Sequence, residues 1–325
     1  MTTRVIKYRE GIQEALREEM IRDQSVFLIG EDIGTRGGSY KATDTLQDQF
    51  GEERILNAPI SEAAIVGAAL GAALAGARPV AEIMYIDFSG LAMDQIFNQC
   101  AKFHFMTGGS AIVPLVIRTQ GGAGRGIAAH HSQSLEAWYS HIPGLKVVMP
   151  STPYDVKGLL KASIRDDNPV FFIEHKLLYL STGPVPEEEY IIPLGKADIK
   201  KEGDDVTIIT YSKMVMDSLK AAEQLEKEGI SAEVLDLRTL VPLDVEAIVE
   251  SVGRTHKVVI VSEACKTGGF AGEIAMTIME QAFDLLDAPI KRVTGLDTPI
   301  PYAFHLEAAV IPNPDWIIKA VKEVV

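Results

Sequence analysis

The stretch SEAAIVGAALGAALAGARPVAEIM, residues 61–84, decides the expected fold of this 325-residue chain. Ser61 is a favoured helix-capping residue, and the small and apolar residues that follow it predict a helix through Leu74. The residues from Arg78 to Met84 predict a strand. A buried helix followed at once by a strand is typical of a parallel sheet that is covered on both faces.

The same alternation of helices and strands extends outward from this stretch. In the first half, strands are predicted at 25–30, 78–84, 113–119, 145–149 and 169–174, with helices at 8–20, 61–74, 88–105 and 153–165. In the second half, strands are predicted at 205–211, 232–237, 257–261 and 290–293, with helices at 214–227, 244–252, 270–283 and from 314. The sequence therefore predicts two α/β domains, 1–180 and 204–325. The polar, proline-rich residues 181–203 between them are expected to form a linker that does not pack.

The composition excludes several classes of protein. Lysine and arginine number 31 against 45 acidic residues, and the resulting charge of −14 disfavours binding to nucleic acid or to a membrane surface. The longest apolar run, Ala63–Ala77, is about 15 residues, whereas a membrane span needs roughly 20. Met1–Glu10 lacks the apolar run of a signal peptide. The two cysteines, Cys100 and Cys265, are too few for a disulfide framework, so we expect a cytoplasmic protein.

The helix after Ser61 carries two features with alternative explanations. Gly67 and Gly71 lie on one face because they are four residues apart, and each costs about 1 kcal/mol of helix stability relative to alanine. Contact with a helix of another subunit and close packing on the sheet of the same chain both explain them. Glu62 lies in the first turn, where a carboxylate interacts favourably with the helix dipole. Burial would also raise its pKa and suit proton transfer.

Two histidines and two glycine-rich stretches are candidate site elements. His130 and His131 follow Gly121–Gly126 at the end of a predicted strand, where a histidine is a candidate acid–base group. A solvated histidine and a structural histidine are the alternatives. Gly121–Gly126 and Gly34–Gly38 both lack the lysine and hydroxyl pair of a P-loop, and neither is a clean dinucleotide fingerprint. Both are therefore predicted to be loops that line a cavity.

Residues 163–169 end one predicted helix and precede a strand. Asp166 and Asn168 in such a turn usually hydrogen-bond their own backbone. Their oxygens would also suit a hard monovalent cation. From the residues alone, the plain turn is favoured.

Several short motifs occur in one order along the chain. They are Gly30-Glu-Asp32, Pro59-Ile-Ser-Glu-Ala63, Asp94-Gln95, His131-Ser-Gln-Ser134, Pro143-Gly-Leu-Lys-Val147, Ser151-Thr-Pro-Tyr-Asp155, Asp236-Leu-Arg-Thr-Leu240 and Pro242-Leu-Asp244. Together they resemble the β subunit of the thiamine-diphosphate-dependent first component of 2-oxo acid dehydrogenase complexes, over essentially the whole chain. Pyruvate, branched-chain 2-oxo acid and acetoin dehydrogenases share this subunit. The resemblance implies a transketolase-like pyrimidine-binding domain followed by a transketolase C-terminal domain.

The resemblance also implies the residues of the site. Glu62 matches the acid that hydrogen-bonds the aminopyrimidine ring of thiamine diphosphate and shares a proton with it. Phe88 matches the aromatic residue packed against that ring, and Ile60 matches an apolar contact. His131 matches the histidine that faces the substrate and the incoming lipoyl group. The remaining matches form an implied potassium site: Leu115, Ser163, Ile164, Asp166 and Asn168. At this turn the resemblance favours a cation over the plain turn.

One motif of such enzymes is absent from the sequence. The Gly-Asp-Gly motif that binds magnesium does not occur, and the nearest match is Gly203-Asp-Asp205 in the predicted linker. The resemblance therefore implies that this chain carries half of a cofactor site. An α subunit would supply the ligands of magnesium and of the diphosphate, in an α2β2 heterotetramer. A lipoyl acyltransferase would be the second partner.

The resemblance implies an oxidoreductase subunit that acts on an oxo group and uses a lipoyl disulfide as acceptor. Met84–Phe88 and Glu174–Tyr179 favour the pyruvate and acetoin branches, and pyruvate dehydrogenase is the expected activity. It would decarboxylate the 2-oxo acid and acylate lipoyl groups. Acetoin dehydrogenase and branched-chain 2-oxo acid dehydrogenase are the alternatives within the family. A non-catalytic scaffold and an NAD-dependent dehydrogenase are the alternatives outside it.

Overall fold

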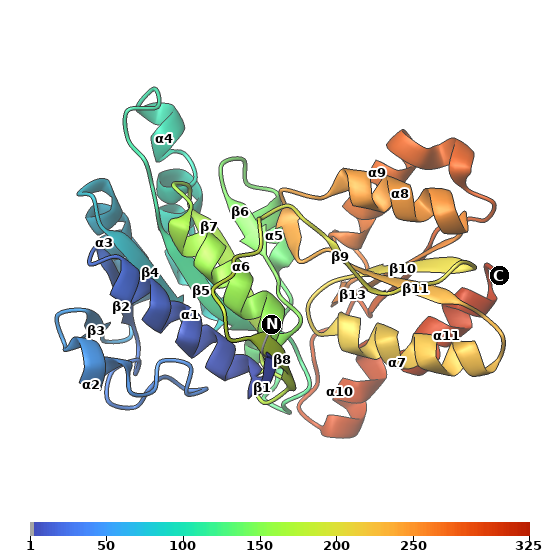
Figure 1. Cartoon of the computed structure of the whole chain (residues 1–325), viewed down its shortest axis with the longest axis horizontal. Coiled ribbons are helices and arrows are strands. Elements are labelled where there is room, and N and C mark those ends of the chain that lie inside the picture. Colours follow the sequence, from blue (N-terminus) through green and yellow to red (C-terminus); the bar gives the residue numbers. More distant parts are fainter. Residues whose placement is uncertain (1–2) are drawn as a thin grey trace. The chain divides into compact units, whose positions relative to one another are not determined.

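The computed structural model describes residues 3–325, which form two compact units. The first unit comprises the chain up to residue 121 together with residues 138–194, and the second comprises residues 122–137 and 195–325. Both units are α/β, which confirms the predicted fold class (Figure 1). By its contacts the segment 122–137 groups with the second unit, although it interrupts the first unit in the sequence.

Parallel strands build the sheet of the first unit. Six of them run in the order β6-β7-β5-β4-β2-β3. Their bounds are β2 (Val26–Gly30), β3 (Ile55–Asn57), β4 (Arg78–Ile83), β5 (Val116–Gly121), β6 (Lys146–Val148) and β7 (Val170–His175). Every residue of β5 and β7 is buried, as expected for central strands of a sheet covered on both faces.

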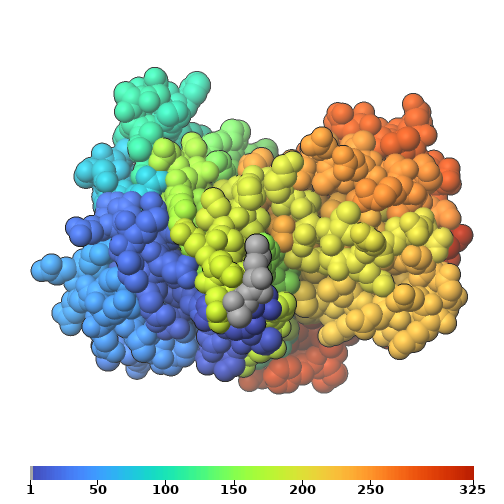
Figure 2. Space-filling view, in the orientation of Figure 1, coloured from blue at the N-terminus to red at the C-terminus, as the bar shows by residue number. Residues whose placement is uncertain are grey.

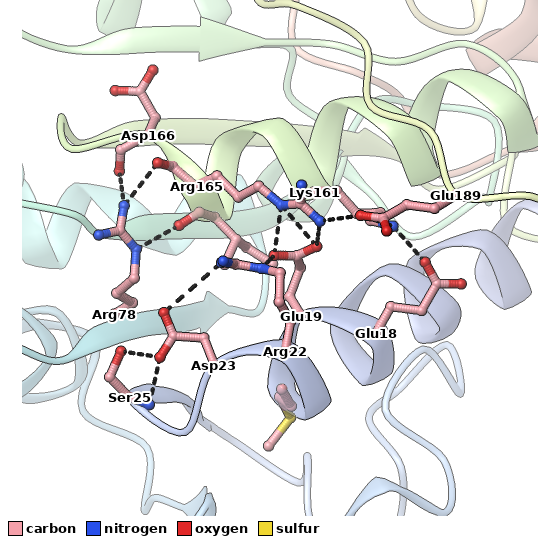
Figure 3. A network of polar contacts seen from close by, with 12 residues as sticks. Glu18, Glu19, Arg22, Asp23, Ser25, Arg78, Lys161, Arg165, Asp166 and Glu189 are labelled. Carbon is pink, nitrogen blue, oxygen red and sulfur yellow. Dashed lines mark hydrogen bonds and ion pairs between the residues drawn. The ribbon is translucent and has the colours of Figure 1, made fainter.

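Two long helices of the first unit pack side by side, α1 (Tyr8–Arg22) and α6 (Pro153–Arg165) (Figure 1). The hydroxyl of Thr152 accepts a hydrogen bond from the backbone N–H of Asp155 at 3.1 Å and so caps α6. Ion pairs join the helices: Lys161 to Glu18 at 2.6 Å and Arg165 to Glu19 at 2.7 Å (Figure 3). The other helices of this unit are α2 (Leu46–Phe50), α3 (Glu62–Leu74) and α4 (Phe103–Met106).

The helix predicted over 88–105 is broken into three pieces. They are a 3₁₀ helix, η1 (Ile86–Ala92), a π-helical segment, η2 (Asp94–Cys100), and α4. The hydroxyl of Ser89 donates to the carbonyl of Ile86 and so competes with the regular helical pattern. On the α3 side, Ser61 occupies the capping position as predicted, but its side chain makes no capping hydrogen bond. The predicted start of α3 and its N-cap residue are therefore confirmed, but Ser61 does not cap the helix through its side chain.

The segment 181–203 is more ordered than its composition predicts. Its first part forms β8 (Thr182–Pro186), which pairs antiparallel with β1 (Thr3–Lys7). Its last part forms β9 (Asp198–Lys201), which pairs antiparallel with β11 (Ala232–Asp236). The expectation that these residues do not pack is wrong because proline is tolerated in strands at a sheet edge or in a two-stranded ribbon.

The second unit has a sheet in the order β14-β13-β10-β11-β9. Besides β9 and β11, its strands are β10 (Val206–Thr210), β13 (Val258–Cys265) and β14 (Lys291–Gly295). The short strand β12 (Thr239–Val241) follows β11 in the sequence. Helices α7 (Met214–Lys227) and α11 (Pro314–Lys322) lie on one side of this sheet, and α8 (Val245–Thr255) and α9 (Ala271–Ala282) lie on the other (Figure 1). The remaining pieces are η3 (Ala129–His131), α5 (Glu136–Ser140), η4 (Phe283–Leu285) and α10 (Phe304–Val310).

Within residues 3–325, no helix combines the length and the apolar character needed to cross a membrane. The surface of the first unit nevertheless carries a projecting segment around α4, drawn in teal in Figure 2. In α4, Phe105 is 87% exposed and Met106 is 60% exposed. Exposed apolar side chains that gather on one projection mark a surface suited to contact with another protein.

Candidate functional site

The acid Glu62 is buried at the beginning of α3, where it is 6% exposed. It follows β3, the neighbour of β2, and Glu31 directly follows β2. The two acids therefore lie near the carboxyl ends of adjacent parallel strands, which is where ligands bind in sheets of this kind. The first turn of a helix also favours a carboxylate there.

Glu31 is a second buried acid beside Glu62. Burial, followed by the negative charges of Glu62, Asp32 and Glu82, raises the pKa of Glu31. Within residues 3–325, its buried Oε1 atom has no hydrogen-bond partner. A buried polar atom without a partner is costly in a closed protein, so this pair of acids is suited to a polar ligand. The sequence motif Gly30-Glu-Asp32 contained this residue, but no role was predicted for it.

The two predicted apolar contacts of the ring, Ile60 and Phe88, both expose part of their side chains. Ile60, two residues before Glu62, is 82% exposed, and Phe88 lies partly exposed in η1. An isoleucine that is almost fully exposed next to a buried acid offers apolar surface to a planar ring. These residues belong to the first unit, as does the implied potassium set, whereas His131 belongs to the second.

The sheet of the first unit also buries a network of ion pairs and hydrogen bonds that was not predicted from the sequence. Arg118 of β5 donates to Glu82 of β4 at 2.8 Å and to Glu174 of β7 at 2.6 and 3.0 Å. Gln120 donates to Glu82 at 3.1 Å, and the Tyr179 hydroxyl donates to Glu174. The available signal was a charged residue inside each of three predicted strands of the parallel sheet, because central parallel strands are buried on both faces.

Four members of the implied potassium set lie at the end of α6 or in the turn after it, and Leu115 directly precedes β5. Figure 3 shows one of them, Asp166, with Arg78 beside it. The oxygens of this set already have protein donors. Arg78 donates to the Ile164 carbonyl at 3.0 Å and to the Asp166 carbonyl at 2.9 Å. Burial acts to raise the pKa of Asp166, but hydrogen bonds from Lys146 and from Asn168 leave it below the usual value.

The other members of that set are also hydrogen-bonded. The Leu115 carbonyl accepts from the N–H of Val170 at 2.9 Å, and the Ser163 carbonyl accepts from the N–H of Asp166 at 3.3 Å. Two protein cations, Arg78 and Lys146, therefore neutralise the turn that a potassium ion would occupy. Potassium binding at this turn stays a prediction.

His131 lies in the second unit, at the end of η3. It is half-buried, and its ring centroid is 4.4 Å from that of His130. The preceding glycine-rich stretch is not available to a dinucleotide, because the N–H groups of Gly124 and Gly126 donate to the carboxylate of Glu307 at 2.7 and 2.9 Å. This observation disfavours the NAD-dependent alternative.

A cavity of about 720 Å³ opens beside the histidines in the second unit. One wall is the segment that carries His130, and the other walls come from residues 263–265, Thr267 and residues 295–300. The lining therefore includes Glu263, Cys265 and Asp297 as well as leucine, proline and isoleucine side chains. A mostly apolar cavity with a few polar groups is typical of a small-molecule site. The glycine-rich stretch was predicted to line a cavity, but none of its residues lines this one.

Behind the histidine segment, Glu136 is buried at 1% exposure and accepts a hydrogen bond from the Tyr211 hydroxyl at 2.9 Å. Tyr211 also contacts the Ser262 hydroxyl at 2.8 Å. Burial raises the pKa of Glu136 to about 7. A carboxyl with a raised pKa in the folded state makes folding less favourable once the unfolded chain has lost the proton.

We expect Glu136→Gln to change the pH dependence of stability. Between pH 4.5, the ordinary glutamate value, and about pH 7, unfolded wild-type chain loses a proton that the folded chain retains, so its stability falls. Over this window the variant should gain up to about 3 kcal/mol relative to the wild type. Melting temperatures of both proteins from pH 4.5 to 8 test this, with the exposed Glu280→Gln as control. A difference that does not vary with pH would contradict it.

Two protein-family models match this chain, one after the other along the sequence. The family model "Transketolase, pyrimidine binding domain" matches residues 4–181, and "Transketolase, C-terminal domain" matches residues 195–317. Among solved structures, the chain is similar to a split-gene transketolase described as an inactive β4 tetramer, with a TM-score of 0.80 and 25% identity over 98% of both chains.

Three similar proteins match nearly the whole chain. It is 50% identical to the 2-oxoisovalerate dehydrogenase subunit beta of Bacillus subtilis (strain 168), covering 98% of each. It is 48% identical to the mitochondrial pyruvate dehydrogenase E1 component subunit beta of Caenorhabditis elegans, covering 97% of this chain and 91% of that one. It is also 48% identical to the acetoin:2,6-dichlorophenolindophenol oxidoreductase subunit beta of B. subtilis, covering 98% and 97%.

Proposed function

This chain belongs to the transketolase-like family of β subunits of 2-oxo acid dehydrogenase E1 components, and on that basis we propose that it is the β subunit of a pyruvate dehydrogenase. It would decarboxylate the 2-oxo acid and transfer the acyl group to lipoyl groups of an acyltransferase. Several pyruvate dehydrogenase β subunits that are 46–48% identical to the chain support pyruvate as substrate. The observation that carries the catalytic proposal is the buried Glu62 beside a second acid with an unpartnered oxygen.

The residues around Glu62 fit the pyrimidine end of thiamine diphosphate. Glu62 would hold the ring by a hydrogen bond, with Phe88 and Ile60 as apolar contacts. Bound thiamine diphosphate would supply the electron sink for cleavage of the bond next to the substrate oxo group. Glu62 would share a proton with the ring. Because the pKa of Glu31 is raised, Glu31 retains a proton more readily and adds less negative charge beside Glu62.

An α subunit is the first proposed partner. This sequence lacks a Gly-Asp-Gly motif, so an α subunit would hold magnesium and the diphosphate in an α2β2 assembly. The small-residue face of α3 suits a contact between two β subunits, since a Cβ atom at Gly71 would meet no described atom within 4 Å. At Gly67 the nearest atom, Gln95 Cγ, is at an ordinary 3.7 Å. These observations favour the subunit contact over close packing within the chain.

We also propose a cytoplasmic location, in line with the sequence. Cys100 is buried and Cys265 is exposed, and both are free thiols. Free thiols suit a reducing compartment.

The substrate is tested with the assembled α–β protein and a lipoyl domain as acceptor. We expect release of carbon dioxide from pyruvate, with kcat/KM at least about 10-fold higher than for 3-methyl-2-oxobutanoate, because extra methyl groups must fit the same pocket. Each chain assayed alone should be inactive. A preference for the branched substrate would assign the chain to the branched-chain enzymes, and acyl transfer from acetoin without carbon dioxide would assign it to the acetoin enzymes.

A further inference from the structure

An internal carboxylate fills the glycine-rich loop that precedes His131. The N–H of Gly124 donates to Glu307 Oε1 at 2.7 Å, and the N–H of Gly126 donates to Oε2 at 2.9 Å. Glu307 lies on α10 and is 1% exposed. The loop therefore uses its backbone N–H groups as an anion-binding nest, and the anion is a side chain of the second unit.

The two glycines are required by this geometry. Gly124 has φ of +94° and Gly126 has φ of +62°, both in the region that favours glycine. A Cβ atom at Gly126 would lie only 2.7 Å from the ring of Phe304, three residues before Glu307. The glycine-rich loop therefore packs closely against α10 at two places, Phe304 and Glu307. This explains the pattern Gly-Ala-Gly-Arg-Gly without any phosphate ligand.

A second carboxylate anchors the same segment on both sides of the histidine. Glu263 of β13 accepts from the N–H of Ala123 at 2.8 Å and from the hydroxyl of Ser134 at 3.1 Å. Further along, Glu136 accepts from Tyr211. Residues before and after His131 are thus attached to the frame of the second unit by hydrogen bonds to acids.

We propose that Glu307 is a positioning residue for His131, which rests on the proposed role of His131 in acyl transfer to the lipoyl group. The segment 121–126 contains four glycines and would otherwise sample many conformations. The two hydrogen bonds to Glu307 select one of them and so fix where the following turn, η3, places the imidazole. Glu307 itself touches neither substrate nor cofactor in this proposal.

The test uses Glu307→Gln in the assembled α–β protein. A glutamine can accept at only one of its two terminal atoms, so one glycine N–H loses its partner. We expect hydrogen–deuterium exchange in peptides containing Gly124 and Gly126 to become roughly tenfold faster. Transfer to a lipoyl domain should fall about 10–100-fold through kcat, because small displacements of a reacting group are costly. Oxidation of the 2-oxo acid with an artificial electron acceptor should change less than about twofold.

Two further variants test whether the effect of Glu307→Gln acts through His131. In a His131→Ala background, Glu307→Gln should cause no additional loss of lipoyl transfer, since the two act through one group. The exposed Glu280→Gln on α9 is the matched control and should behave as wild type. If Glu307→Gln does not fold, Glu307→Asp can replace it, because aspartate retains the charge on a shorter side chain. It should give the same changes in hydrogen exchange and lipoyl transfer with smaller magnitude.

These measurements distinguish failure of the positioning role of Glu307 from failure of the proposed role of His131 in acyl transfer. Unchanged exchange at the glycines, or equal losses in lipoyl transfer and in artificial-acceptor oxidation, would overturn the role of Glu307. So would additive effects of the two substitutions. If His131→Ala leaves lipoyl transfer unchanged, the proposed role of His131 fails, and with it the positioning role. The exchange measurement would still report whether Glu307 anchors the loop.

Discussion

Replacing Glu62 with glutamine in the assembled α–β protein is expected to lower the rate of 2-oxo acid oxidation by about 10²–10⁴-fold. The amide keeps the size of the side chain, but it cannot exchange a proton with a bound ring at neutral pH, and general acid–base groups contribute about this much. Steady-state rates with pyruvate and an artificial electron acceptor would measure the loss. Titration with thiamine diphosphate would show whether affinity falls as well.

The matched control is Glu53→Gln, which alters an exposed glutamate just before β3. It should retain the full rate. Unchanged activity in Glu62→Gln would remove the central support for a catalytic role. It would favour the alternative in which this chain is a non-catalytic scaffold.

Replacing Arg118 with methionine is expected to destabilise the first unit by about 3–5 kcal/mol, the usual cost of removing one partner from a buried ion pair. Arg118 is 1% exposed and lies between the carboxylates of Glu82 and Glu174. Without the guanidinium group, two negative charges would remain buried beside each other. The melting temperature should fall by roughly 5–15 °C.

Two comparisons test that explanation. Adding Glu82→Gln and Glu174→Gln to Arg118→Met should recover at least half of the lost stability, because no uncompensated charge then remains. Arg36→Met breaks an exposed ion pair with Asp32 and should cost less than about 1 kcal/mol. Equal melting temperatures for Arg118→Met and the wild type would show that the buried network does not contribute to stability.

Local sequence patterns were sufficient for elements whose burial repeats with the helix or strand period. The predicted helices at 153–165 and 214–227 match α6 and α7 in both bounds. Strand pairing between residues far apart in the sequence does not produce such a local pattern. The ribbon of β1 and β8 joins residue 3 to residue 186, and neither strand has the apolar alternation of a buried strand.

Only part of the candidate site was predicted, because some of its residues depend on partners that are distant in the sequence. Glu62 and His131 were selected from motifs, whereas Glu31 and Arg118 acquire their importance from neighbours on other strands. Glu82, Arg118 and Glu174 stand out as charged residues inside predicted strands, but their pairing joins three different strands. Glu307 had no local signal, because its partners are backbone N–H groups about 180 residues away.

The membership of residues 122–137 in the second unit limits how the protein can be dissected. A truncation that ends in the 181–203 segment would keep His131 but discard the acids that anchor it, Glu263 and Glu307. The complementary fragment would keep those acids with their acceptor oxygens deprived of donors. Neither half would thus preserve a native histidine loop, so studies of that loop require the intact polypeptide.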